Sequence, residues 1–137
     1  MALLCNSKLV KNMRYYNKPC PKKGPFIAYK LGWLDVINRI PAIIKLEIPA
    51  DAIINVPFFR ADKAKVIEIM TLDEKPAKEK RARAFWLCNF VYPLGETVFT
   101  KDGTEEEFFG SWIHFFIEFR DVIHYLEDLS ELIKYEQ

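Results

Sequence analysis

The chain has 137 residues, half of them hydrophobic, and its 20 basic residues almost balance its 19 acidic ones. This length and composition suit one well-packed domain and argue against disorder. The 3 cysteines show no C-x-x-C spacing, which predicts neither a zinc site nor a disulfide framework and favours a reducing, intracellular compartment. No apolar run reaches the length of a membrane span, so we expect a soluble protein with no membrane partner.

The charges are divided between the two ends of the chain. Residues 1–34 carry seven Lys or Arg and no acid, whereas residues 104–137 carry nine Asp or Glu and two Lys or Arg. Because opposite charges attract, we expect the two ends to lie together. The alternative is that the basic end forms a patch for a polyanion.

The first 25 residues are expected to form a basic N-terminal arm. Three prolines and a glycine between residues 19 and 25 predict a turn-rich link, after which residues 26–137 form a single domain. Tyr15 and Tyr16 lie among the basic residues of the arm. We expect them to anchor the arm to the domain, although aromatic rings among basic residues can also stack on nucleic-acid bases.

Three strands are predicted in the first half of the domain. Alternating apolar and polar residues predict strands over residues 26–31, 42–48 and 64–70. Between the first two, residues 32–40 predict a helical turn, which Pro41 should end. In the second strand, the side chains expected to share one buried face are those of Ile44, Leu46 and Ile48.

Two hairpins are predicted in the second half. Residues 73–83 are strongly charged and should form a solvated connector. After it, residues 84–92 and 96–100 should pair as a hairpin, because Pro93-Leu-Gly95 turns the chain between them. The pair Asp102-Gly103 predicts a further hairpin turn, since the tight turn of a hairpin needs positive φ angles.

The organising stretch of the chain is residues 110–125, where a strand pattern changes into a helical pattern. Trp112–Ile117 is apolar except for His114, as expected of a central strand covered on both faces. From Phe119 onward the spacing is helical, and the side chains predicted to face the core are those of Val122, Leu126, Leu129 and Ile133. Together these patterns predict an α+β fold with a bent, mainly antiparallel sheet of five or six strands and a C-terminal helix packed on it.

Four stretches carry a family resemblance, and they are Lys45–Ala52, Arg60–Ile69, Phe90–Val98 and Ile113–Ile117. In order and spacing they resemble an uncharacterised domain found beside pentapeptide repeats in proteins of phages and giant DNA viruses. The resemblance covers about residues 26–126 and implies a stand-alone copy of that domain. It also implies an α+β fold and a viral source, hence a place in the host cytoplasm or the virion, but no settled activity.

His114 and Tyr29 are the candidate catalytic residues. Trp112-Ile-His-Phe-Phe116 and the helix to Tyr125 are similar in layout to a strand and helix of the poly-ADP-ribose polymerase fold, in which Tyr29–Gly32 would be the first nicotinamide-binding strand. An ADP-ribosyltransferase-like or nucleotide-binding domain is therefore an alternative. The competing interpretation of His114 is a core histidine that a backbone group or a carboxylate satisfies.

An interaction module without enzymatic activity is the favoured function, because few polar residues could converge on a catalytic site. We expect no metal and no cofactor. The 20 aromatic residues exceed what a small core readily hides, so an apolar patch should bind a protein partner or a second copy. Its candidate residues are Trp33, Phe58, Phe59, Phe108 and Phe109.

Weak nucleic-acid binding is the third possibility, because basic residues gather in two segments of the chain. The candidate polyanion contacts in the arm and in the charged connector are Lys8, Lys11, Arg14, Lys22, Lys23, Lys75, Lys78, Lys80, Arg81 and Arg83.

Overall fold

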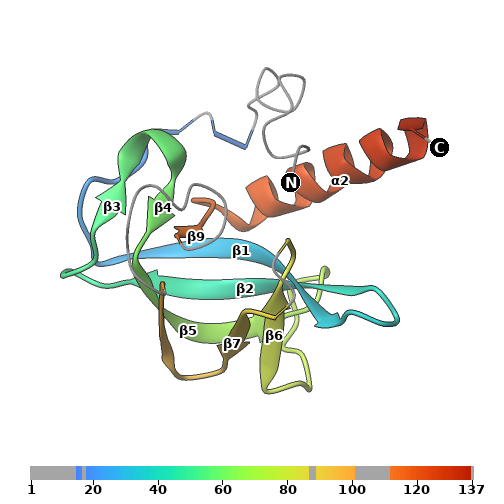
Figure 1. Ribbon diagram of the computed structural model, residues 1–137, viewed down its shortest axis with the longest axis horizontal. Helices are drawn as coiled ribbons and strands as arrows, with labels where there is room; N and C mark the ends of the chain where they lie inside the picture. The colour runs from blue at the N-terminus through green and yellow to red at the C-terminus, as the bar shows by residue number, and fades with distance from the viewer. Residues whose placement is uncertain (1–14, 17, 87–88, 101–111, 137) are drawn as a thin grey trace.

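The computed structural model describes residues 15–16, 18–86, 89–100 and 112–136. The elements in chain order are β1 (Phe26–Asp35), β2 (Ile40–Ile48), β3 (Ile54–Asn55), a single 3-10 turn (Val56–Phe58), β4 (Arg60–Ala61), β5 (Lys63–Met70), β6 (Arg81–Ala84), β7 (Val91–Pro93), β8 (Thr97–Phe99), β9 (Ile113–His114) and α2 (Phe119–Glu136) (Figure 1). The fold is the predicted α+β arrangement, with a mainly antiparallel sheet and a C-terminal helix.

The main sheet has six strands in the order β7-β6-β1-β2-β5-β8 and curls strongly. Its two edge strands, β7 and β8, are consecutive in the chain, and only residues 94–96 separate them. The backbone of this turn forms hydrogen bonds with residues on both sides of the sheet. Leu94 N–H donates to the Lys80 carbonyl over 2.8 Å, and Gly95 N–H donates to the Val66 carbonyl over 2.8 Å. A tight turn can join opposite edges only if they approach one another, so the sheet is curved almost into a barrel.

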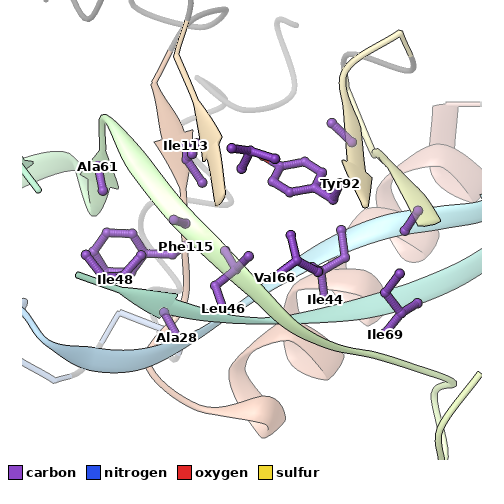
Figure 2. Packing of buried hydrophobic residues seen from close by; sticks show 14 of the residues in the cluster. Ala28, Ile44, Leu46, Ile48, Ala61, Val66, Ile69, Tyr92, Ile113 and Phe115 are labelled. Carbon is purple, nitrogen blue, oxygen red and sulfur yellow. The ribbon is translucent and has the colours of Figure 1, made fainter. Parts of the chain in front are cut away.

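The inner face of the curved sheet encloses an aliphatic core. Ile44, Leu46 and Ile48 are fully buried on one face of β2, as their alternation predicts. Figure 2 shows these side chains with Val66 and Tyr92 in one enclosed cluster. A bulge, where the register of β2 and β5 shifts between Lys45 and Leu46, adds to the bend of the sheet.

A second core lies between the outer face of the sheet and helix α2 (Figure 1). The helix contributes Val122, Tyr125 and Leu129, all buried, which pack against residues of β1, β2 and β5. Leu126 is only half-buried, so the buried stripe of the helix runs closer to Tyr125 than the pattern predicts. The predicted face member Ile133 has a side chain outside the described part.

The stretch Trp112–Phe116 joins the two sheets. The prediction of a central strand was wrong: β9 has two residues and belongs to a small sheet of order β3-β4-β9. The reason is that partners from two sheets share the backbone groups of this stretch. Phe115 N–H donates to Phe59 beside β4, whereas Phe116 exchanges hydrogen bonds of 2.8 and 2.7 Å with Tyr29 of β1. Both faces of the stretch are nevertheless covered, as expected, because Phe115 lies in the first core and Phe116 in the second.

The predicted helical turn over residues 32–40 was wrong. Strand β1 continues to Asp35, a turn follows, and Pro41 lies inside β2. Pro41 is tolerated because β2 pairs with β5 only from Ile43 onward, so no ladder bond is needed from its nitrogen on that side. Gly32 marks a close approach of strands, because a Cβ there would lie 2.6 Å from the Arg83 carbonyl oxygen.

The predicted hairpin of residues 84–92 and 96–100 was also wrong. Strand β7 pairs with β6, and β8 pairs with β5, on opposite edges of the sheet. The charged connector ends earlier than predicted, because Arg81–Ala84 is strand β6 with its two arginines exposed and its two alanines buried. A strand with only alanines on its buried face has a weak apolar signal, which explains the error. The turn predicted at Asp102-Gly103 lies outside the described residues.

The described part of the N-terminal arm packs on the domain. Tyr15 is 2% exposed and lies in the second core, and Tyr16 packs against the same core. The centroid of the Tyr15 ring lies 5.9 Å from that of Phe116 and 5.4 Å from that of Tyr125. Lys18 forms an ion pair with Glu118. Tyr15 and Tyr16 therefore anchor the arm, and opposite charges from the two ends of the chain meet.

Candidate functional site

Of the two candidate catalytic residues, Tyr29 lies at a surface hollow. Tyr29 lines an open hollow of about 460 Å³, together with Glu74, Ile117, Glu118, Phe119 and Arg120. His114 is not part of its wall. Its ring lies 4.8 Å from that of Phe116, and Nε2 is 2.6 Å from the Tyr16 hydroxyl oxygen. The partner of His114 is therefore a tyrosine, where we expected a backbone group or a carboxylate. The nucleotide-binding alternative stays a prediction, which a thermal-shift screen with NAD and ADP-ribose would test.

The predicted aromatic patch is not brought together. Trp33 is half-buried beside β6, stacked on Phe85 at 4.5 Å with its indole N–H bonded to the Phe85 carbonyl. Phe59 is half-buried near β9, where its ring lies 6.1 Å from that of Phe115. Of this set, Phe58 is exposed, at 45%. Phe108 and Phe109 lie outside the described residues.

The basic candidates remain on the surface. Lys22, Lys23, Lys75, Lys78, Lys80, Arg81 and Arg83 are all exposed, whereas Lys8, Lys11 and Arg14 lie outside the described residues. Lys75 lies 3.8 Å from Asp73, an exposed pair that contributes little to stability. Polyanion binding by these residues stays a prediction.

The end of the β1–β2 hairpin is an exposed apolar surface that the sequence reasoning missed. Ile37 is 91% exposed and Ile40 is 43% exposed. The turn is nevertheless well defined, because Asp35 accepts bonds from Ile37 N–H at 2.9 Å and from Asn38 N–H at 3.2 Å. These bonds hold the pKa of the exposed Asp35 carboxyl below its usual value. Arg39 completes the turn with a φ of 56°.

A cluster of cations lies where the main sheet meets β9. The Lys30 ammonium donates to the His114 carbonyl oxygen at 3.1 Å, and the Arg60 guanidinium donates to the Trp112 carbonyl oxygen at 3.3 Å. In an extended segment, carbonyls two residues apart point to the same side. Lys30 and Arg60 therefore approach the same edge of β9. We call Lys30, Arg60 and His114 the junction cluster.

The charged forms of Lys30 and His114 are disfavoured. Burial, followed by the positive charge of Arg60, lowers the pKa of Lys30 from 10.5 to about 7. Burial, Arg60 and Lys30 together hold the pKa of His114 well below 6.5, so its ring is neutral at pH 7. Burial raises the pKa of Tyr16 far above its usual value, so its hydroxyl keeps the proton that the bond with His114 uses. Each of the three cluster residues keeps partial solvent exposure.

The sequence contained one signal for this cluster. Lys30 lies two residues from Ala28 and two from Gly32, and its partner across β2 is the fully buried Ile44. A lysine in register with core residues on the inner face of a strand is unusual and needs a local partner. Because the strand was predicted to end at residue 31, the sequence did not reveal that Lys30 lies within a longer strand and pairs with the buried Ile44.

The geometry defines an α+β domain with a nearly closed antiparallel sheet, a helix on its outer face, and a cationic junction at one end. Among the described residues, no group of three His, Cys, Asp or Glu could hold a metal ion. No helix in the described ranges is long and apolar enough to cross a membrane.

The chain belongs to a family of unknown function, DUF5758, whose model matches residues 16–122. The matched range begins at Tyr16 in the arm and ends at Val122 in α2, so it includes the junction cluster. Comparisons with curated proteins and with solved structures found no match.

Proposed function

We propose that this domain is a non-enzymatic interaction module that binds a protein partner through the end of its β1–β2 hairpin. The observation that carries the proposal is Ile37, an aliphatic side chain 91% exposed at the tip of a turn that Asp35 holds in place. Full burial of such a side chain contributes about 1.5–3 kcal/mol. Little ordering entropy opposes this gain when the turn is already formed.

The charges around the hairpin end indicate the chemistry of the partner. Arg39 is exposed in the same turn, whereas the Asp35 carboxylate is already bonded to backbone N–H groups of the turn. An apolar anchor beside an arginine complements an apolar pocket that has an acidic group at its rim. We therefore infer a protein partner with a pocket of that kind, in preference to a flat apolar surface.

The viral part of the proposal is supported by the family resemblance of the sequence motifs alone. It assigns the domain to a viral accessory protein that acts in the infected cell or in the virion. The proposed binding role of the hairpin does not depend on a viral source, because its exposed tip and its charges are properties of the chain itself.

Site-specific photocrosslinking tests the proposal. A photoreactive phenylalanine analogue is placed at position 37 in one variant and at position 53 in another, since Ile53 beside β3 is also exposed, at 62%. We expect a crosslinked protein from position 37 only. We also expect Ile37→Asn to abolish binding of that protein while Ile53→Asn retains it, because only the first removes the anchor.

A crosslink between two copies of the purified chain would identify self-association as the form of the interaction and would support the role of the hairpin. Equal crosslinking from both positions, or none from position 37, would contradict it. Salt provides a second criterion, because binding assisted by Arg39 should weaken as ionic strength rises.

A further inference from the structure

A surface hollow forms where three separate segments of the chain meet, and its volume is about 460 Å³. It is lined by residues of β1, of the turn after β5, and of the chain at the first turn of α2, and these are Tyr29, Glu74, Ile117, Glu118, Phe119 and Arg120. Hollows of roughly 300–1,000 Å³ commonly hold small ligands in proteins. None of the lining residues belongs to the end of the β1–β2 hairpin, so a ligand here would be additional to the proposed protein partner.

One wall of the hollow is aromatic. Tyr29 and Phe119 are both half-buried, so part of each residue remains accessible. The centroids of their rings lie 6.2 Å apart, and the ring planes are almost perpendicular, at 88°. Two rings at this angle form a corner against which an apolar or aromatic side chain can pack.

The hollow also contains a carboxylate and a guanidinium of opposite charge that are not paired. Glu74 and Arg120 are exposed, and neither forms an ion pair with another residue in the described ranges. The other carboxylate of the wall, Glu118, is already paired with Lys18. The charge of Arg120 opposes the rise in the Asp121 pKa that burial causes, but the two side chains form no ion pair.

The backbone determines where these two charges lie. Glu74 has a φ of 64°, a conformation that non-glycine residues rarely adopt, and its N–H donates to the Thr71 carbonyl at 3.1 Å. Thr71 N–H in turn donates to the Lys75 carbonyl at 2.8 Å and closes the turn. Arg120 lies in the first turn of an 18-residue helix. A ligand that bridges the two charges therefore needs to order side chains only, which limits the entropy cost of binding.

We infer that this hollow binds a free α-amino acid with an apolar or aromatic side chain. The Arg120 guanidinium holds the ligand carboxylate, the Glu74 carboxylate holds the ligand ammonium, and the ligand side chain packs in the aromatic corner. A simple anion would be repelled by Glu74, and a simple cation would be repelled by Arg120. An α-amino acid carries both charges close together and so complements the wall at both points.

Thermal unfolding of the full chain tests the site, with L-phenylalanine and L-leucine at millimolar concentration as the probes. N-acetylphenylalanine lacks the ammonium and phenylalanine amide lacks the carboxylate, so neither of these blocked forms can make both charged contacts. We expect the free amino acids to raise the unfolding midpoint by several degrees at saturation and the blocked forms to leave it unchanged. The probe with the larger shift identifies the preferred side chain, and a shift with either one supports the site.

Variants separate the hollow from a general effect of the solute. Arg120→Gln and Glu74→Gln should each lower the affinity measured by calorimetry at least about tenfold, because each removes a charge-assisted contact. The matched controls Arg81→Gln and Glu96→Gln change exposed residues outside the hollow and should bind as the wild type does.

Three results would overturn the site: no shift with either free amino acid, equal shifts with the blocked forms, or wild-type affinity in either hollow variant. All four substituted side chains are exposed, so each variant is expected to fold, and its unfolding midpoint without ligand checks this. If a hollow variant did not fold, the comparison of free and blocked amino acids on the wild type would still decide the question.

Discussion

The two cores of this domain are built differently. The core inside the curved sheet consists of side chains from alternating strand positions, such as Ile44, Leu46 and Val66, and it contains few polar atoms. The core beneath α2 is aromatic and collects residues from both ends of the chain, including Tyr15 and Tyr125. It also contains polar contacts, as when Trp86 Nε1 donates to the Tyr125 hydroxyl at 3.1 Å.

The two cores differ in the interactions that stabilise them and in the ionisable groups that lie at their boundaries. The inner core is stabilised mainly by burial of aliphatic area, which is insensitive to pH and to solutes. The outer core ends at the junction cluster, where His114 bonds to Tyr16 of the arm and Lys30 lies beside Arg60. Lys30 and His114, whose pKa values are lowered, lie at this boundary.

The largest effect is expected in the inner core. Leu46 is fully buried, so Leu46→Ala should lower the free energy of unfolding by about 2–5 kcal/mol through lost burial and a residual cavity. Chemical denaturation monitored by tryptophan fluorescence measures the loss. A cost below about 1 kcal/mol would mean that the inner face is loosely packed and that the comparison fails.

A smaller effect is expected beneath the helix. Leu129 is 1% exposed, so Leu129→Ala should cost about 2–3 kcal/mol, whereas the half-buried Leu126 provides a matched control that should cost about 1 kcal/mol when changed to Ala. The order of the two unfolding free energies decides which stripe of α2 faces the sheet. The reverse order would restore the stripe predicted from the sequence.

The polar contact of the outer core should contribute less still. Tyr16→Phe removes the hydroxyl that bonds to His114 Nε2 and should cost about 1–2 kcal/mol, because a buried ring nitrogen loses its partner. Tyr29→Phe is the control, since the Tyr29 ring packs on Phe119 through its apolar surface. Equal stability of the two variants would show that the Tyr16 hydroxyl is not required.

Much of this architecture could be predicted, because local patterns determine it. The alternation in β2 and β5 and the helical spacing from Phe119 each predict an element that the structure confirms. The N-terminal tyrosines were also expected to anchor the arm, as they do. In these cases the apolar period within a short window decides the structure.

The errors arose where distant partners override the local signal. Pro41 predicts a stop, but it is accommodated because β5 does not reach that part of β2. β6 and β7 are short strands that depend on pairing with one another and with β1. The junction cluster depends on three strands from separate parts of the chain, so its one signal in the sequence is the position of Lys30 among core residues of a strand, and nothing there indicates Arg60 or His114 as its neighbours.

The central claim is that Lys30 is held in a partly desolvated environment beside the positive charge of Arg60. The folded pKa of about 7 lies below the unfolded value of 10.5, so the unfolded chain binds more protons between these pH values. Stability should therefore rise as the pH rises through that window. Lys30→Met should flatten the rise, because it removes the titrating group.

The most direct measurement is the pKa of Lys30 itself, read from the NMR signal of its ε-methylene group as pH increases, with Lys30→Met used to assign the signal. The account predicts a midpoint of about 7. A midpoint near the ordinary value of 10.5 would contradict it.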